Sequence, residues 1–212
     1  MIPAERVLHG VNAVSARRPT IRLIDPQLLL TAYGNGYFPM AEPKTGEIAW
    51  YSPDPRTIFE LDGFKVPRSL RQTIRKGMVE VRLNQRFEEV VRGCANRRET
   101  WISEEIVRSY VRLHELGHAH SVEAWKNGAL AGGLYGVAIG GAFFGESMFS
   151  LVRDASKVAL VALVERMKER GYVLLDTQYT TPHLAMFGAK EIPRAEYLKR
   201  LNRAIAKPCR FV

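Results

Sequence analysis

The chain has 212 residues, of which 46% are hydrophobic and 25% charged, and it contains two cysteines. These proportions are typical of a globular protein with a substantial core, and they exclude a disordered tail, a collagen-like repeat and a disulfide-stabilised mini-protein. Lysine and arginine number 31 against 22 aspartate and glutamate, and the formal charge of +9 is compatible with tRNA, DNA or an anionic membrane as a partner.

The amino-terminal segment is not predicted to be a secretory signal, because residues 1–18 contain charged side chains and lack a continuous apolar core. Its three arginines leave a transit peptide as a less favoured alternative. Cys94 and Cys209 lie far apart and neither belongs to a CxxC pair. This cysteine usage favours a reducing compartment, so we predict a cytoplasmic protein without a disulfide framework or a cysteine zinc site.

The first predicted element is a helix that begins after Asp25 and reaches about Tyr33. Aspartate caps helix N-termini, and the proline that follows it suits the first helical position. Two glycines end this helix, and four prolines then interrupt a loop-and-strand region that runs to about Phe64. We therefore predict a small N-terminal domain over residues 1–64 and a larger domain over residues 65–212.

Four helices are predicted in the larger domain. Pro67 begins a basic helix, and two more helices cover about residues 84–94, with Asn84 as the cap, and residues 103–117. The fourth covers residues 155–170, is capped by Asp154 and ends at a glycine.

Residues 127–145 are uncharged throughout and long enough to span a bilayer as a helix. Seven of them are glycine, each of which weakens a helix by about 1 kcal/mol relative to alanine. The Asn127-Gly128 turn and the later Gly140-Gly141 break instead predict three antiparallel strands and no membrane segment. With the following helix and a strand over residues 172–178, they predict an α/β (α+β) fold with a largely antiparallel sheet and one strand–helix–strand step.

Residues 114–118 match the HExxH pattern of zinc proteases, and His120 adds a third imidazole. That pattern requires both histidines to project from one continuous helix. Gly117 ends the predicted helix between them, and histidine near a helix C-terminus interacts favourably with the helix dipole. We therefore favour a helix end and expect no metal.

Two predicted strands carry polar side chains on faces that are otherwise apolar. Strand alternation groups Phe144 with Glu146 and Met148, and Leu174 with Asp176 and Gln178. A carboxylate in such surroundings is costly unless it has a partner. Three polar groups on strands expected to be neighbours are compatible both with a buried structural pair and with a functional site.

Positive charge is concentrated between Lys65 and Trp101, where ten lysines and arginines meet few acids. Phosphate binding needs such a patch, and a nucleic-acid base needs a flat ring on which to stack. The candidates for phosphate contacts are Arg68, Arg71, Arg75 and Lys76, and those for stacking are Trp50, Tyr51 and Trp101. A solvated surface and ordinary core aromatics are the alternatives.

Ten segments, in order between about residues 25 and 200, are typical of one family. They are residues 32–39 (AYGNGYFP), 50–56 (WYSPDPR), 100–102 (TWI), 114–123 (HELGHAHSVE), 132–138 (GGLYGVA), 144–150 (FGESMFS), 155–157 (ASK), 176–178 (DTQ), 188–189 (GA) and 192–194 (IPR). Together they resemble the leucyl/phenylalanyl-tRNA–protein transferase family.

The resemblance implies an acetyltransferase-like (GNAT-type) catalytic domain over residues 65–212 that works without coenzyme A. The lack of a glycine-rich phosphate loop between Ser150 and Asp154 agrees with this. The implied reaction moves Leu or Phe, and Met less well, from aminoacyl-tRNA to proteins with an N-terminal Arg or Lys, which marks them for the N-degron pathway. No cofactor or metal is implied. An acetyl-CoA-dependent enzyme and a non-catalytic tRNA-binding module are the alternatives.

The same resemblance assigns Asp176 and Gln178 to the catalytic centre. Aminolysis of an ester needs a proton acceptor for the amine and a donor for the oxyanion. An amide is a poor base, so we expect the Gln178 oxygen to orient the amine, Asp176 to polarise it and the ribose 2′-hydroxyl to relay the proton. Glu146 is expected to help hold the aminoacyl-adenosine end.

The donor side chain is expected to enter an apolar pocket of Leu134, Met148, Leu163, Met167 and Leu175. Two features depart from the family pattern. Met40 stands where the family often has tryptophan, which leaves adenine stacking to Trp101 and Trp50. Leucine at 134 and 163 and methionine at 167 replace the residues often found in the pocket, so its shape is expected to differ.

Overall fold

The structure is a computed structural model that describes residues 23–212. The transit-peptide alternative concerns residues 1–18 and lies outside the described residues. The helices are α1 (Pro26–Gly34), α2 (Arg68–Arg75), α3 (Phe87–Ala95), α4 (Glu104–Glu115), α5 (Ala155–Glu169), α6 (Pro182–Ala185) and α7 (Arg194–Ile205), with a 3-10 turn η1 (Leu61–Gly63). The strands are β1 (Phe38–Ala41), β2 (Ile48–Tyr51), β3 (Arg56–Phe59), β4 (Glu80–Leu83), β5 (Ala119–Lys126), β6 (Ala129–Ile139), β7 (Ala142–Ser150), β8 (Leu174–Gln178) and β9 (Lys190–Ile192).

The strands form two sheets. β1 and β2 make a small antiparallel sheet, and the other seven strands follow the order β4-β5-β6-β7-β8-β3-β9. Every pairing in the large sheet is antiparallel except β7 with β8, which α5 connects. The predicted α/β (α+β) fold, with a mostly antiparallel sheet and one strand–helix–strand step, is therefore confirmed.

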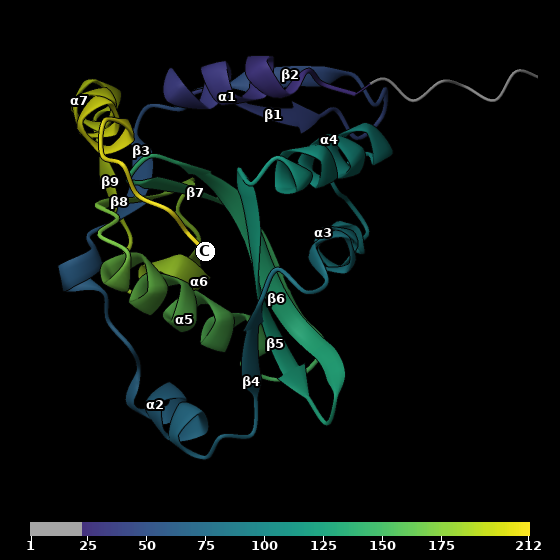
Figure 1. Cartoon of the computed structure of the whole chain (residues 1–212), viewed down its shortest axis with the longest axis vertical. Coiled ribbons are helices and arrows are strands. Elements are labelled where there is room, and N and C mark those ends of the chain that lie inside the picture. The colour runs from purple at the N-terminus through teal and green to yellow at the C-terminus, as the bar shows by residue number, and fades with distance from the viewer. Residues whose placement is uncertain (1–22) are drawn as a thin grey trace, which may run out of the picture.

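Helices cover both faces of the large sheet (Figure 1). On one face, Leu163 and Met167 of α5 pack with Phe143 and Leu175 of the sheet. On the other face, α1, α3 and α4 bury a second apolar cluster that includes Phe144. The sheet is thus the central layer of the molecule, and its two faces have separate cores.

Local sequence features form several elements as predicted. The Asp25 side chain accepts a hydrogen bond from the Leu28 backbone N–H at 3.0 Å and caps α1. Asn127 and Gly128 have φ values of 52° and 76° in the β5–β6 turn, so the predicted hairpin is confirmed. At the second turn Gly140 has a φ of 54°, and a Cβ there would lie 2.2 Å from the Ile205 carbonyl oxygen. The segment predicted not to be a membrane helix therefore lies in β6 and β7, and within residues 23–212 no helix is long and apolar enough to cross a membrane.

The capping prediction for Asn84 is wrong, and the one for Asp154 is right in position but not in its hydrogen bond. Asn84 does not cap α3: it follows the edge strand β4 with a φ of 58°, and its side chain accepts a hydrogen bond from the Ser121 backbone N–H at 3.0 Å. The sequence prediction missed β4, which exists because it pairs with β5. Asp154 directly precedes α5, but its side chain pairs with Lys157, and the Ser156 N–H donates instead to Ser150 Oγ at 2.8 Å.

The N-terminal part of the chain contributes to both sheets. β1 and β2 pair with each other, whereas β3 lies inside the large sheet between β8 and β9. The division into residues 1–64 and residues 65–212 stays a prediction, and β3 belongs structurally with the larger sheet.

Candidate active site

A pocket of about 430 Å³ lies where β7 and β8 separate. The two strands pair only between residues 142–144 and residues 174–176, and each continues beyond that point. Of the predicted site residues, those that line the pocket are Trp101, Leu134, Glu146, Met148, Leu163, Leu175 and Gln178. Asp176, Met167 and Trp50 do not line it.

An irregularity in β7 decides which side chains reach which face of the sheet. Gly136 pairs with Gly145 and Tyr135 with Ser147, so Glu146 is an extra residue without a partner in β6. Phe144 consequently packs in the α1 and α4 core, and Met148 packs in the α5 core. The prediction that Phe144, Glu146 and Met148 share one side is wrong for Met148, because the bulge reverses the alternation.

A second irregularity occurs in β8. Ile58 pairs with Asp176 and Thr57 with Gln178, so Thr177 is the extra residue, and Gln178 has a φ of 59°. Gln178 lines the pocket, and its Nε2 atom is buried with no hydrogen-bond partner among the described residues. An unsatisfied buried amide donor costs about 1–3 kcal/mol, and here it is available to a ligand oxygen.

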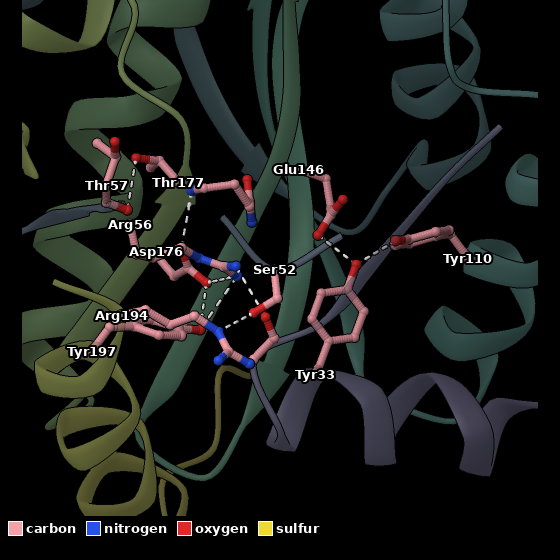
Figure 2. Close-up of polar contacts among 12 residues, drawn as sticks. Tyr33, Ser52, Arg56, Thr57, Tyr110, Glu146, Asp176, Thr177, Arg194 and Tyr197 are labelled. Atoms are coloured by element: carbon pink, nitrogen blue, oxygen red, sulfur yellow. Dashed lines mark hydrogen bonds and ion pairs between the residues drawn. The ribbon is translucent and has the colours of Figure 1, made fainter. Parts of the chain in front are cut away.

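Asp176 is completely buried, and its carboxylate is held by four donors (Figure 2). Arg56 donates from Nε to Oδ1 at 2.9 Å and from Nη2 to Oδ2 at 2.7 Å. The Tyr197 hydroxyl donates to Oδ2 at 2.8 Å, and the Gln178 backbone N–H donates to Oδ1 at 3.0 Å. The bidentate arginine and the backbone bond fix Asp176 and Gln178, the residues on either side of the extra Thr177, in one geometry.

Arg56 joins three parts of the chain. Its guanidinium lies over the rings of Phe38 and Tyr197, at 4.9 and 4.6 Å from the ring centroids, and donates to the Gly36 carbonyl at 3.0 Å. Burial and the charge of Asp176 raise the pKa of Tyr197, so its hydroxyl stays a donor. Arg56 lies in one of the segments that resemble the transferase family, but the sequence predicted no role for it. Its only signal was its position at the start of an apolar strand.

Glu146 has a different environment: among residues 23–212 no arginine forms an ion pair with it, and its partner is a tyrosine (Figure 2). The Tyr33 hydroxyl donates to Glu146 Oε1 at 2.5 Å, and the Tyr33 and Tyr110 hydroxyls are hydrogen-bonded to each other. Burial, reinforced by the negative charge of Asp176, raises the pKa of Glu146 to about 8. The carboxyl group is therefore mostly protonated at neutral pH. The sequence indicated Glu146, but not its two tyrosine neighbours.

The rim of the pocket combines aromatic and flexible side chains. Trp101 lines the pocket, and its carbonyl accepts a hydrogen bond from the Ala41 N–H at 3.0 Å. This bond ties Trp101 to β1, whose Phe38 and Met40 also line the pocket. Trp50 is in β2, opposite Pro39, so the structure does not bring it to the pocket.

The basic residues do not form one patch. The cations of the α2 region (Arg68, Arg71, Arg75 and Lys76) are exposed and lie outside the pocket lining. Three other arginines of the basic stretch are paired with glutamates: Arg82 with Glu80, Arg86 with Glu89, and Arg92 with Glu88 and Glu104. The expected concentration of unpaired charge is therefore smaller than the sequence suggested.

The HExxH segment, residues 114–118, forms the C-terminal end of α4 and the turn that follows it, as predicted. α4 ends at Glu115, which pairs with Arg112. The His114 ring stacks on Phe87 with centroids 4.3 Å apart, and its Nδ1 is hydrogen-bonded to the Ala119 carbonyl. Over residues 23–212 no cluster of three or more histidine, cysteine or acidic side chains is arranged to hold a metal.

Comparison with known proteins relates this site to a family. A model of leucyl/phenylalanyl-tRNA protein transferases matches residues 58–202, and a model of their N-terminal domain matches residues 22–54. The transferase of Gloeobacter violaceus is 55% identical over 188 residues, covering 89% of this chain and 97% of that protein. The transferase of Rubrobacter xylanophilus is 58% identical over 183 residues, covering 86% and 95%.

Among solved structures, an N-acetyltransferase from Thermoplasma acidophilum in complex with coenzyme A is 16% identical, with a TM-score of 0.32, over 44% of this chain and 74% of that chain. The relatives are aminoacyltransferases, and the site corresponds to that class of enzyme. Within that class, the chain belongs to the leucyl/phenylalanyl-tRNA protein transferase family. The family resemblance found in the sequence is thereby confirmed.

Proposed function

We propose that the enzyme transfers Leu or Phe, with Met as a poorer donor, to the α-amino group of proteins that begin with Arg or Lys. The donor is the aminoacyl ester at the 3′ end of a tRNA, and the reaction marks the acceptor for the N-degron pathway in the cytoplasm. The observation that carries this proposal is the pocket itself, in which an apolar part lies beside the Gln178 Nε2 atom, which has no hydrogen-bond partner within residues 23–212.

The apolar part of the pocket suits the side chain of the donor. Leu134, Met148, Leu163 and Leu175 line it, together with Leu160, which sequence reasoning did not select. Branched and flexible apolar side chains accept both leucine and phenylalanine, and they reject charged residues because a charge would be buried without a partner. Met167 is fully buried behind this wall, so we propose that it supports the pocket without touching the donor.

The transfer step is aminolysis of the ester. The acceptor amine attacks the ester carbonyl, a C–N bond forms and the C–O bond to the tRNA breaks. The amine loses one proton, and the departing ribose 3′-oxygen gains one through the adjacent 2′-hydroxyl. We assign the Gln178 Nε2 group to the developing oxyanion and the Gln178 oxygen to the attacking amine.

Asp176 acts in this proposal as a positioning residue. Its carboxylate is buried and already accepts four hydrogen bonds, so it has little capacity to polarise an incoming amine directly. It holds the backbone of Gln178 in the bulge that directs the amide into the pocket. Glu146, as a largely protonated carboxyl group beside Tyr33, offers a hydrogen bond to the aminoacyl-adenosine end, whose adenine stacks on Trp101.

The decisive experiment supplies labelled Phe-tRNA or Leu-tRNA and a matched pair of acceptors that differ only in an N-terminal Lys or Ser. We expect RNase-sensitive transfer of label to the Lys acceptor only. Equal labelling of both acceptors would refute the proposed specificity, and no transfer at all would refute the proposed function.

The role of Gln178 predicts a split between catalysis and binding. Gln178→Ala should lower kcat by about a hundredfold, the scale of losing one oxyanion donor, while the Kd for aminoacyl-tRNA stays within a factor of about two. Single-turnover rates and filter binding measure the two quantities. Equal losses in rate and affinity would contradict the role given to the amide.

A further inference from the structure

Arg97 lies just after α3, at the rim of the same pocket, and the protein itself fixes its guanidinium. Nε donates to the Cys94 carbonyl at 2.8 Å. Nη2 donates to Ser147 Oγ at 3.0 Å and, more weakly, to the Met148 carbonyl at 3.4 Å. These acceptors belong to the end of α3 and to the bulged part of β7, so the guanidinium is held beside the opening between β7 and β8.

The charge of Arg97 is not neutralised. Its acceptors are carbonyl and hydroxyl oxygens, and among the described residues no carboxylate lies within ion-pair distance of it. Arg92, on the preceding helix turn, differs because it binds Glu88 and Glu104. Glu146 shares the pocket with Arg97 and carries little negative charge at neutral pH because its pKa is raised to about 8.

The neighbours of Arg97 on the rim are suited to a nucleoside. Trp101 offers a flat ring four residues further along, and Met40 and Phe38 complete the apolar border. An arginine beside a stacking ring is a common arrangement for binding a nucleotide, since the ring takes the base and the guanidinium takes a phosphate. Arg97 and Trp101 thus provide both halves of such a contact at the mouth of the pocket.

We propose that Arg97 binds the phosphate group that joins the terminal adenosine of the tRNA to the preceding nucleotide. The assignment rests on the proposed function, because the adenosine must stack beside Trp101 with its aminoacyl ester inside the pocket. Arg97 then sets the register of the 3′ end, and α2 contacts the body of the tRNA separately. The competing role for Arg97 is a structural clamp between α3 and β7.

The test uses three donors that differ in phosphate content. They are 3′-phenylalanyl-adenosine, which has no phosphate, its cytidylyl-adenosine counterpart, which has one, and intact Phe-tRNA. Arg97→Gln removes the charge and keeps hydrogen-bonding capacity, Arg97→Lys keeps the charge, and Arg92→Gln is the matched control on the same segment. KM and kcat are measured for each donor, and thermal unfolding checks that each variant is folded.

We expect Arg97→Gln to raise KM about tenfold for the two phosphate-containing donors and to leave both constants for phenylalanyl-adenosine unchanged. Arg97→Lys should recover part of the loss, and Arg92→Gln should behave as the unmodified enzyme. An equal loss on all three donors would identify the clamp and overturn the assignment, as would unchanged constants on all three. No transfer by the unmodified enzyme from any donor would overturn the proposed function, and the assignment with it.

Discussion

Two carboxyl groups of this site, the buried Asp176 and the partly buried Glu146, differ in the partners that surround them. Asp176 faces the guanidinium of Arg56 and a backbone N–H, so its negative charge is compensated where it lies. Glu146 faces the hydroxyl of Tyr33, and burial raises its pKa to about 8. The same chemical group therefore serves as a fixed anion in one place and as a neutral hydrogen-bonding acid in the other.

The raised pKa of Glu146 predicts a pH dependence of stability. The unfolded chain loses this proton near pH 4.5, whereas the folded protein keeps it up to about pH 8. The folded state binds more protons between these values, so the free energy of unfolding falls by up to about 1.4 kcal/mol per pH unit as the pH rises from 4.5 to 8. Above about pH 8 the bound proton no longer stabilises the folded state, and the fall stops. Glu146→Gln removes this pH dependence.

Denaturant unfolding of the unmodified protein and of Glu146→Gln, at pH 5 to 9, measures this effect as a difference. We expect the variant to gain stability relative to the unmodified protein as the pH rises to about 8 and to show no further change above it. Two curves that stay parallel over the whole range would show that Glu146 does not carry the extra proton.

At the scale of single elements, the bulge in β7 determines the site. It places Glu146 with Tyr33 on one face of the sheet and Met148 in the α5 core on the other face. The bulge depends on a glycine in the neighbouring strand, because a Cβ on Gly136 would lie 2.2 Å from the Phe144 carbonyl oxygen. The irregularity in β7 therefore depends on the sequence of β6 as well as on that of β7.

Gly136→Ala should therefore destabilise the protein by about 1–3 kcal/mol, the usual cost of overpacking, and lower the transfer rate by displacing Glu146. Gly63→Ala is the control, because its Cβ would lie 3.6 Å from the Glu60 Cβ, an ordinary contact, and it should change stability by less than about 0.5 kcal/mol. Urea denaturation and the transfer assay measure the two effects. Equal stability of the two variants would contradict the dependence of the bulge on Gly136.

At the scale of the whole molecule, the pocket is assembled from parts that are distant in sequence. The small β1–β2 sheet supplies Phe38 and Met40, the segment between α3 and α4 supplies Arg97 and Trp101, and α5 supplies the apolar wall. α2 packs against α5 at the edge of the molecule (Figure 1), and its arginines are not among the residues that line the pocket. This arrangement separates the amino-acid pocket from the basic surface proposed to hold the tRNA body.

The separation predicts that affinity and amino-acid preference change independently. Reversing Arg71 and Arg75 to Glu should weaken tRNA binding at least tenfold and reduce its salt dependence, because phosphate contacts release counterions. The ratio of Leu to Phe transfer should not change, since such contacts position the tRNA and do not specify the amino acid. Filter binding at several salt concentrations and transfer with both donors measure these quantities.

The matched control reverses Arg108 and Arg112 on α4, which already pair with Glu104 and Glu115. We expect this control to change tRNA affinity by less than a factor of two. If both double variants bind tRNA as well as the unmodified protein, the α2 surface is an ordinary solvated face.

Much of the fold could be predicted because its signals are local. The Asp25 cap, the Asn127-Gly128 turn and the helical pattern of α5 each depend on residues within a few positions of one another. The edge strand β4 was missed, because a short strand with exposed residues has no strong pattern of its own and forms by pairing with β5. Asp154 was predicted at the N-cap position of α5, but the hydrogen bond to the first turn was missed for the same kind of reason, since Ser150 reaches it from the end of β7.

The sequence by itself determined several of the helices, the β5–β6 hairpin, the family and the polar residues, such as Glu146 and Gln178, around which the site is built. Only the tertiary structure decided that Asp176 is enclosed by Arg56 and Tyr197, that Trp50 and Met167 lie outside the pocket lining, and that Arg97 stands at its rim. The physical reason is that periodicity and caps act over a few residues, whereas burial, bulges and charge pairing depend on which distant segments the sheet brings into contact.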